Sequence, residues 1–509
     1  MQRPGRLLAA AVGVAAGAAS LAVAELFAAV GTTTRSPILD VGDRVIDLVP
    51  PWLKDVAIQL FGTNDKLALL AGIGFILALY SAVVGVVAMR HRLLLGIVGI
   101  LAFGAVGATA ALMAGRGPVS VLPASIGALV GVAVLVALHR TWFRRTALEV
   151  GIASEDRRRF LVGLGATFVT AGLAAGAGRL TAAGAAVAPV APAGSLPRVA
   201  RPLPPVGPGA DLGVPGLSPF ITPNDEFYRI DTALSVPRVS IEDFSLRIFG
   251  MVDRELTLSY ADLIGRAQIE SDITLTCVSN EVGGQLVGNA RWQGVRLDAL
   301  LEEAGVQPGE DQVVGQSVDN YTCGFPVAAA TDGRDAMIAI GMNGQPLPLV
   351  HGFPARLVVS GLYGYVSATK WLKEIEITTF EAFDHYWARR EWSAQAPIKT
   401  QSRIDTPGPL DSVPAGPGTI AGVAWAQTRG IAKVEVRIDD GSWQVAELAD
   451  EVANTTWRQW RLRWEVTPGR HTVTCRATDA TGELQAEERA TPMPDGATGW
   501  HSIVVLGGD

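Results

Sequence analysis

The feature that most constrains this chain is a series of five apolar stretches within its first 180 residues. Each is long enough to cross a hydrocarbon layer of about 30 Å, and the middle three contain no charged residue. The predicted spans are residues 7–30, 67–89, 93–115, 117–138 and 160–178. We therefore expect residues 1–180 to form a transmembrane region of five helices that contacts the lipid bilayer.

Basic residues predict the orientation of these spans. They precede the first span at Arg3 and Arg6, join the second and third at positions 90–92, and precede the fifth between positions 140 and 159. All of these positions lie on one side if the N-terminus is cytoplasmic, as the positive-inside rule requires. Everything after residue 178 is then outside, so we expect a multi-pass protein of the cytoplasmic membrane with an extracytoplasmic main part.

The fifth span has an unusual leader, DRRRFL at positions 156–161. It resembles the twin-arginine signal, which directs proteins that are already folded across a membrane. Ordinary positive-inside charge accounts for the same arginines, so both interpretations stay open. The other spans suggest no site: Glu25 can snorkel to the interface, and His91 and His139 lie at cytoplasmic span ends, which leaves no pair of haem ligands within the bilayer.

The rest of the chain divides by composition. Residues 181–218 are rich in Pro, Ala and Gly, which favours an extended linker. Residues 219–398 mix strand-like and helix-like runs without regular alternation, which predicts an α+β domain. Residues 399–509 contain short alternating strands separated by turns, which predicts a β-sandwich. No phosphate-cradling glycine motif is present, so we expect neither a nucleotide fold nor a nucleic-acid partner.

Cys277 has the most distinctive surroundings of any residue in the exported part. It follows the alternating run Ile273–Thr276 and precedes two glycines, so it is predicted to stand where a buried strand opens into a turn. A free cysteine more often packs as a small hydrophobe, and the local sequence alone favours that alternative. Cys323 and Cys475 are the other cysteines, too few for a disulfide framework and without zinc or c-type haem spacing.

Several ordered motifs around and after Cys277 resemble the sulfite oxidase family of molybdenum-cofactor enzymes. They are Leu275-Thr276-Cys277 with Asn280, Gly288 to Leu297, Met342 to Pro348, His351 to Arg356, Lys370-Trp371-Leu372, and Trp387 to Arg390. Their common order is more specific than any single motif. The resemblance covers residues 219–509 and implies a molybdopterin-binding domain (219–398) followed by an immunoglobulin-like dimerisation domain (399–509), and hence a homodimer.

The resemblance also implies a Mo-molybdopterin cofactor and its ligands. Cys277 is the implied molybdenum ligand beside the two pterin sulfurs, a role that suits a soft thiolate. The residues implied around pterin and phosphate are Tyr228, Arg229, Asn280, Arg291, His351, Arg356, Ser367, Thr369 and Lys370. Taken singly, His351, Arg356 and Lys370 are typical of ordinary turn or surface positions. Their joint order favours a cofactor site.

The chain departs from animal and plant sulfite oxidases near the implied metal. Glu281 stands where those enzymes carry an arginine, and a negative charge there weakens the binding of a dianion. Trp392 stands where they carry a tyrosine, and an indole cannot exchange a proton as a phenol does. Asp319 lies in a segment that lines the pocket in relatives, whereas Cys323 is expected to pack. Trp392 and Asp319 are therefore candidate catalytic residues beside Cys277.

The leading hypothesis is a membrane-anchored, molybdenum-dependent oxidoreductase that transfers an oxygen atom on a small sulfur oxyanion such as sulfite. Reduction of an S-oxide or N-oxide, for example methionine sulfoxide, is the alternative within the same superfamily. The expected electron partner is a cytochrome or the quinone pool. A non-catalytic membrane protein that binds a partner through its β-sandwich is the remaining alternative, and it predicts a pocket that lacks the phosphate-binding residues.

Overall fold

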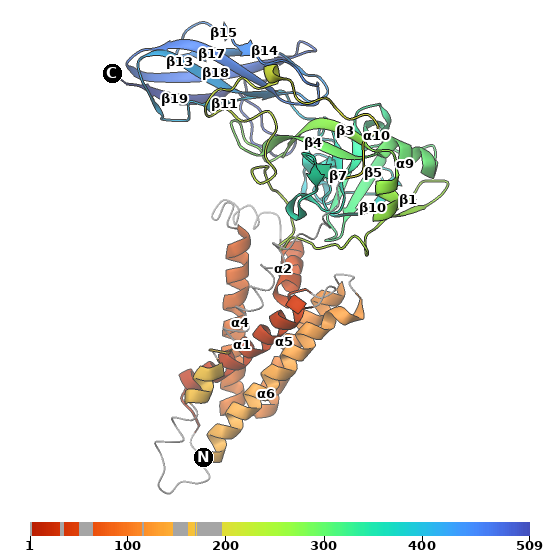
Figure 1. Cartoon of the computed structure of the whole chain (residues 1–509). Helices are drawn as coiled ribbons and strands as arrows, with labels where there is room; N and C mark the ends of the chain where they lie inside the picture. Colours follow the sequence, from red (N-terminus) through yellow and green to blue (C-terminus); the bar gives the residue numbers. More distant parts are fainter. Residues whose placement is uncertain are drawn as a thin grey trace. The chain divides into compact units, whose positions relative to one another are not determined.

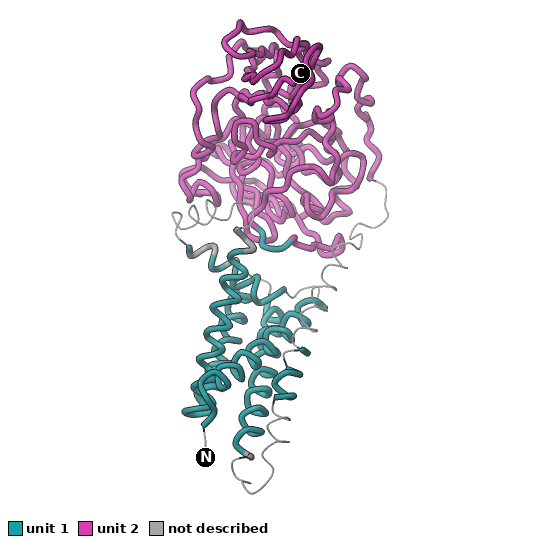
Figure 2. The backbone as a smooth tube through the Cα atoms, turned by 90° about the vertical axis from the view of Figure 1, so that its left-hand side faces the viewer, with its two compact units in different colours: residues 1–189, 233–235 teal, residues 190–232, 236–509 magenta. Residues whose placement is uncertain are grey.

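The computed structural model describes residues 3–30, 35–49, 65–113, 117–145, 161–167, 169–170 and 196–508. The chain forms two compact units (Figure 2). Unit 1 comprises residues 1–189 with residues 233–235, and unit 2 comprises residues 190–232 with residues 236–509. The twin-arginine-like leader at positions 156–160 and the first part of the predicted linker lie outside the described residues.

Unit 1 is a bundle of long apolar helices (Figure 1). Its elements are α1 (Arg6–Val30), α2 (Pro37–Leu48), α4 (Asp65–Arg90), α5 (Leu93–Met113), η2 (Pro118–Val121) and α6 (Leu122–Arg145). Among the described residues, four helices are long and apolar enough to cross a membrane. They coincide with the first four predicted spans. Most of the predicted fifth span lies outside the described residues, although residues 161–167 are helical.

Small residues allow the helices of unit 1 to approach closely. A Cβ atom built on Gly13 of α1 would collide with backbone atoms of α4, and one built on Gly85 of α4 would collide with backbone atoms of α1. Gly104 of α5 and Ala128 of α6 make a similar contact. Glycine and alanine at such positions are typical of helix pairs in membranes, where van der Waals packing drives association.

Two sheets form the first part of unit 2 (Figure 1). The first has the order β2 (Leu256–Ser259), β1 (Ser245–Gly250), β10 (Leu372–Thr378), β5 (Gln312–Ser317), β6 (Thr322–Pro326). The second has the order β3 (Ile269–Thr276), β4 (Val287–Arg296), β7 (Ala336–Met342), β8 (Gln345–Pro346), with β9 (Arg356–Val359) also paired to β7. Because β1 and β10 are parallel while the other pairs are antiparallel, the first sheet is mixed.

Short helices connect these strands. They are η3 (Pro208–Ala210), α8 (Tyr260–Gly265), α9 (Leu297–Ala304), α10 (Ala328–Thr331), η4 (Leu349–His351), α11 (Gly364–Ser367) and η5 (Ala388–Arg390). Strands and helices do not alternate regularly, which agrees with the predicted α+β class. Every residue of β7 is buried. Its sequence is a continuous run of apolar residues, as expected when both faces of a strand are covered.

Two further sheets form the C-terminal part of unit 2. One has the order β11 (Gln401–Thr406), β13 (Gly416–Trp425), β17 (Arg458–Val466), β16 (Glu447–Leu448); the other has the order β12 (Ser412–Val413), β19 (His501–Gly507), β18 (Gly469–Asp479), β14 (Ile431–Ile438), β15 (Gln444–Val445). Alternate residues of both sheets share one core that includes Trp460 and Val434. Two sheets around one core are the predicted sandwich architecture; the immunoglobulin-like topology and the boundaries at 219 and 399 stay predictions.

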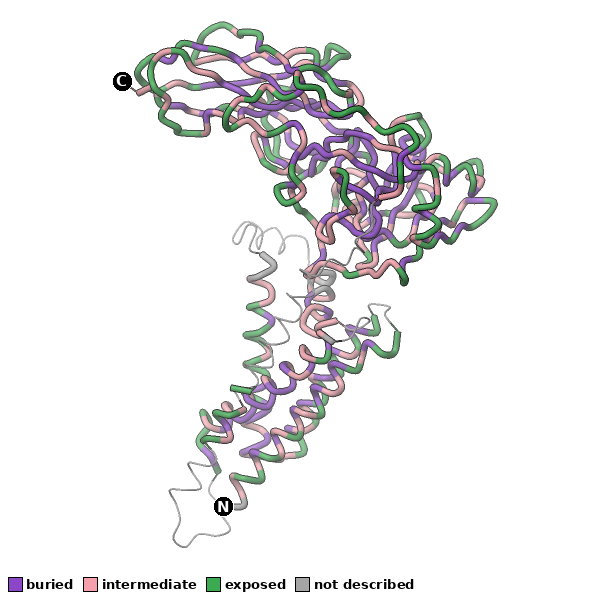
Figure 3. The backbone as a smooth tube through the Cα atoms, viewed as in Figure 1, coloured by how far each residue is buried: buried purple, intermediate pink, exposed green. Residues whose placement is uncertain are grey.

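Burial divides the residues of unit 2 into a buried interior and an exposed surface (Figure 3). The strand β3 lies in this interior and also bonds to the C-terminal part. The Thr274 amide donates to the carbonyl of Thr455 at 3.0 Å, and the Trp457 amide donates to the Thr274 hydroxyl at 2.7 Å. The C-terminal sheets therefore help to position the strand that ends immediately before Cys277.

We predict that Gly294→Ala destabilises unit 2. Gly294 lies at an irregularity between β4 and β7, and a Cβ atom there would collide with the carbonyl oxygen of Ile338. Overpacking of this kind costs about 1–3 kcal/mol, which corresponds to a fall of several degrees in apparent Tm. Gly265→Ala is the matched control, because nothing lies within 4 Å of its Cβ position. Equal apparent Tm values for both variants of the full chain in detergent would contradict this packing.

Candidate active site

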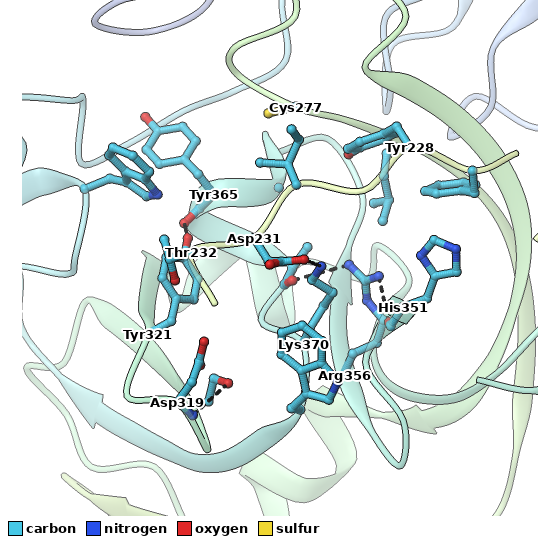
Figure 4. A pocket seen from close by; sticks show the side chains of 18 residues that line it. Tyr228, Asp231, Thr232, Cys277, Asp319, Tyr321, His351, Arg356, Tyr365 and Lys370 are labelled. Carbon is cyan, nitrogen blue, oxygen red and sulfur yellow. Dashed lines mark hydrogen bonds and ion pairs between the residues drawn. The ribbon is translucent and has the colours of Figure 1, made fainter. Parts of the chain in front are cut away.

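One cavity in unit 2 brings together six of the predicted site residues (Figure 4). These are Tyr228, Cys277, Asp319, His351, Arg356 and Lys370. They come from widely separated parts of the chain: Cys277 follows β3, Asp319 lies in the turn between β5 and β6, and Arg356 begins β9. The cavity is therefore a product of the whole domain rather than of one motif.

Cys277 stands where the sequence predicts, directly after the buried strand β3. Its amide donates to the carbonyl of Leu286 at 2.9 Å, and its own carbonyl accepts from the Asn280 amide at 3.0 Å. Gly283 then takes a positive φ of 80°, which favours glycine. The residue is 7% exposed, and burial raises the pKa of the thiol. A bound metal ion reverses this effect, because it deprotonates a coordinating thiol.

The turn after Cys277 is held from both sides. The side-chain oxygen of Asn280 accepts from the Leu286 amide at 2.8 Å. Arg403 of the C-terminal sheets donates to the carbonyl of Gly284 at 2.9 Å, and Arg403 is itself 1% exposed and paired with Asp405. These contacts restrict the turn, so the position of the thiol is set before any ligand binds.

Arg356 is a buried cation without a carboxylate partner among the described residues. Its guanidinium is 5% exposed and donates to the carbonyls of His351 at 3.1 Å and Ala368 at 3.3 Å. It also lies over the ring of Trp292, 4.9 Å from the centroid. Burial lowers the pKa of Arg356 to about 10, so the group stays charged at neutral pH. A buried charge without a counterion is costly, and this one faces the cavity.

Lys370 lies beside Arg356 and shares one carboxylate with a third cation. Its Nζ donates to Asp231 Oδ2 at 2.9 Å, and Nε of Arg229 donates to the same oxygen at 2.8 Å. Burial lowers the pKa of Lys370 to about 8, although Asp231 partly opposes the shift. One carboxylate thus serves both Lys370 and Arg229, while Arg356 has none, and this end of the cavity carries excess positive charge.

His351 and Tyr228 complete this end of the cavity. Burial lowers the pKa of His351 to about 4, so the imidazole is neutral near pH 7. Its Nε2 lies 2.7 Å from the carbonyl of Asn224; because a carbonyl only accepts, Nε2 carries the proton and Nδ1 is free to accept. Burial also raises the pKa of Tyr228, which keeps the phenol neutral. Both rings pack against Phe227.

Six predicted site residues do not line the cavity. They are Arg229, Asn280, Arg291, Ser367, Thr369 and Trp392. The side chain of Arg291 forms an ion pair with Asp272 at 2.8 Å on the neighbouring strand. The hydroxyls of Ser367 and Thr369 donate to the carbonyl of Tyr363 at 3.0 Å and to Cys323 Sγ at 2.7 Å. These side chains have partners within the protein, and their expected contacts with the cofactor stay predictions.

The remaining three also have partners within the protein, and their expected roles stay predictions. Arg229 has a side chain that is 41% exposed and pairs with Asp231, while Asn280 stabilises the cysteine turn. Trp392 lies behind the cavity wall, with its ring centroid 5.9 Å from that of Tyr365 and 5.8 Å from that of Trp387. Glu281 is exposed and does not line the cavity, whereas the carboxylate of Asp319 does.

Several lining residues were not predicted as site residues. Tyr321, Tyr365 and Trp387 contribute aromatic rings, and Asp231 contributes the shared carboxylate. Tyr321 lies only two residues after Asp319, and this proximity was the one local signal available for it. The others are brought in by long-range folding, because the segments that carry them are far from Cys277 in sequence.

Comparisons with known proteins agree with this geometry. The model of the oxidoreductase molybdopterin binding domain matches residues 233–387. The model of the Mo-co oxidoreductase dimerisation domain matches residues 390–505. The chain belongs to the sulfite oxidase family of molybdenum-cofactor oxidoreductases. The family thus accounts for the order of the motifs from Cys277 to Arg390.

Individual relatives are similar over the same region. Mitochondrial sulfite oxidase from Homo sapiens is 32% identical over 317 residues, which cover 53% of this chain and 58% of that protein. NADH nitrate reductase from Solanum lycopersicum is 27% identical over 334 residues, covering 53% of this chain and 36% of that protein. The sulfane dehydrogenase SoxCD from Paracoccus pantotrophus has a solved structure with 24% identity and a TM-score of 0.49, covering 56% of this chain and 80% of that chain. The chain thus spans little more than half of the human relative's length.

The cavity residues fit a molybdopterin cofactor. Cys277 offers a sulfur ligand in a restrained turn, and soft thiolates suit such metals. Arg356 and Lys370 form a cationic end with an uncompensated guanidinium, which matches a phosphate group. Neutral His351 offers Nδ1 as a hydrogen-bond acceptor, and Ala368 also lines the cavity. The family therefore implies a cofactor for which this chain retains the matching donor set.

We predict that Arg356→Met lowers the pterin content of the purified full chain by roughly 10- to 100-fold, the range seen when supporting contacts of a bound metal group are removed. The loss follows because the unpaired guanidinium supplies the missing counter-charge for a phosphate. Fluorescence of the released, oxidised pterin measures it. Arg247→Met is the control, since Arg247 is half exposed, pairs with Glu255 and lies outside the cavity. Equal pterin content in both variants would show that Arg356 does not contribute to cofactor binding.

Acid should destabilise unit 2 through three buried histidines. Burial lowers the pKa of His351, His385 and His501 to about 4 each, against about 6.5 in an unfolded chain. Between these values the unfolded state binds more protons, so stability falls as the pH falls from 6.5 to 4. Each histidine contributes about 1.4 kcal/mol per pH unit. Urea unfolding at several pH values measures the slope, and His385→Gln should reduce it by about a third; an unchanged slope would contradict this account.

Proposed function

We propose that this chain is a membrane-anchored molybdenum-cofactor oxidoreductase that transfers an oxygen atom on a small sulfur compound. The observation that carries the proposal is that one cavity is lined by Cys277, by Lys370 and by Arg356, whose guanidinium has no carboxylate partner among the described residues. A metal thiolate and an anion site in one cavity are what a molybdopterin cofactor requires. A non-catalytic binding protein would not need to retain all three groups.

The chain's own residues have separable tasks in this proposal. When bound, the cofactor supplies the electron chemistry and the oxygen-atom transfer. Cys277 would ligate the metal, Arg356 and Lys370 would balance the phosphate charge, and His351 would offer Nδ1 as a hydrogen-bond acceptor to the pterin. Tyr228 stays neutral and closes the wall by stacking on Phe227, 5.2 Å between centroids. The restrained turn after β3 keeps the thiol in place between turnovers.

Sulfite is the first substrate to test, because the human and other animal relatives carry the name sulfite oxidase. In that reaction sulfite and water give sulfate, two protons and two electrons. Reduction of an S-oxide or N-oxide is the second candidate, and one observation favours it. The part of the cavity lined by Asp319 and Tyr321 contains an acid and no described cation, which suits an oxide without net negative charge better than a dianion.

The membrane helices support an anchored enzyme. With the N-terminus inside, unit 2 lies outside the cytoplasmic membrane, and a twin-arginine route would export it already folded with its cofactor. The electron partner would be a cytochrome or the quinone pool. The match to a Mo-co oxidoreductase dimerisation domain at residues 390–505 supports a homodimer.

Substituting Cys277 by Ser should reduce turnover by about 100-fold or more, by analogy with the loss seen when supporting contacts of a metal are removed. Sulfite and methionine sulfoxide with artificial electron partners are the assays, and molybdenum and pterin are measured in the same preparations. Cys323→Ser is the matched control, because Cys323 is equally buried in the same domain but does not line the cavity. A fully active C277S variant, or wild-type protein from a molybdenum-replete host without molybdenum or pterin, would refute the proposal.

A further inference from the structure

The cavity has a second polar end whose charge is opposite to that of the Arg356 end. Figure 4 shows Asp319 and Tyr321 on one side of the cavity and Arg356 with His351 on the other. Asp319 lies in the turn between β5 and β6, where Asn320 takes a φ of 67° that asparagine tolerates. The Val318 amide bonds the carbonyl of Trp371 at 3.0 Å. This turn therefore presents Asp319 from a restrained backbone.

Asp319 carries a carboxylate oxygen with no protein partner. Oδ1 is buried and accepts no hydrogen bond from a described residue, and the carboxylate forms no ion pair with one. Buried polar atoms are almost always paired, so each exception needs an explanation. Because Asp319 lines the cavity, the natural partner for its carboxylate is a ligand that enters there.

The hydroxyls of two tyrosines that line the cavity donate to backbone carbonyls. The Tyr321 hydroxyl donates to the carbonyl of Tyr365 at 2.6 Å, and the Tyr365 hydroxyl donates to the carbonyl of Ser393 at 2.6 Å. Burial raises the pKa of both phenols, so they stay neutral. What they offer a ligand is ring surface and oxygen lone pairs, which are acceptors.

This end of the cavity thus combines a carboxylate, acceptor oxygens and aromatic rings, and Trp387 adds an indole to the lining. A sulfite dianion needs donors and cations, which are concentrated at the opposite end in Arg356 and Lys370. A positively charged group is the complementary ligand, because aromatic faces attract cations and a carboxylate pairs with them. Desolvation inside a cavity strengthens both attractions.

We propose that Asp319, Tyr321, Tyr365 and Trp387 form a cation subsite, and that the physiological substrate is an organic sulfur or nitrogen oxide that carries a positively charged group. This inference rests on the proposed function and narrows its substrate class. The oxide end of the substrate faces the Cys277 side of the cavity, and its ammonium-like group pairs with Asp319. Bare sulfite leaves this subsite empty.

The test measures binding to the full-length holoprotein in detergent by isothermal titration calorimetry. The probes are choline and 3,3-dimethylbutan-1-ol, which have the same shape and differ in whether the central atom is a charged nitrogen or a neutral carbon. The cation subsite predicts that choline binds about tenfold more tightly, or better, because a desolvated cation gains that much from aromatic faces. Equal affinities in the wild-type protein would overturn the inference.

Two variants locate the effect. Asp319→Asn keeps the size of the side chain and removes its charge, and it should lower the preference for choline by roughly two- to fivefold, because the aromatic faces remain. Glu381→Gln removes the same charge at an exposed position outside the cavity and should leave the preference for choline unchanged. An undiminished preference in the D319N variant would place choline elsewhere and contradict the subsite.

Molybdenum and pterin are measured in the same samples. A failure of the cation subsite can therefore be distinguished from a failure of the proposed function. Loaded protein that does not distinguish choline from the alcohol would overturn the cation subsite and leave the proposed oxygen-atom transfer standing. Protein that prefers choline through Asp319 but contains neither molybdenum nor pterin would support the subsite and refute the proposed function.

Discussion

A buried positive charge without a protein counterion dominates the energetics of the candidate active site. Arg356 is 5% exposed, remains charged at neutral pH and is surrounded by backbone carbonyls and the face of Trp292. Removing such a charge from water costs several kcal/mol unless an anion or a set of hydrogen bonds compensates it. Asp231 and Asp319 are the acidic residues that line the cavity, and Lys370 and Arg229 already share Asp231. This charge balance supports the proposal that an anion binds beside Arg356.

The position of the thiol depends on both halves of unit 2. The strand β3 carries it, and the C-terminal sheets hold that strand through Thr274 and the following turn through Arg403. The match to a dimerisation domain describes an interface role for residues 390–505, but in this chain the same segment also stabilises the turn after Cys277. Changes in the C-terminal sheets would consequently be transmitted to Cys277 even without a second subunit.

Much of the architecture could be predicted from the sequence because it depends on local patterns. Long apolar runs predict membrane helices, and the first four agree with the structure. Cys277 was placed correctly because an alternating strand followed by glycines leaves few alternatives. The environment of Arg291 could not be predicted, because a motif does not report which face of a strand a side chain occupies. In β4 its neighbours Ala290 and Trp292 face the core, while Arg291 points to Asp272.

Other features of the site depend on contacts that no local pattern reports. Ser367 and Thr369 flank Ala368, which lines the cavity, but their hydroxyls bond elsewhere. Tyr365 and Trp387 line the cavity from separate segments. Trp392 does not line it and packs against the ring of Tyr365. Asp319 lines the cavity whereas Glu281 does not, because the turn that carries Glu281 exposes it. The lining of the cavity is thus determined mainly by tertiary structure.

The most direct test of the central claim is the number of sulfur atoms bound to molybdenum, measured by X-ray absorption at the molybdenum edge on the loaded full-length protein. If Cys277 ligates molybdenum, the Cys277→Ser variant loses one sulfur neighbour relative to wild type, while Cys323→Ser loses none. An unchanged sulfur count in the C277S variant would show that Cys277 is not the ligand, and the proposed role of the cavity would then be wrong.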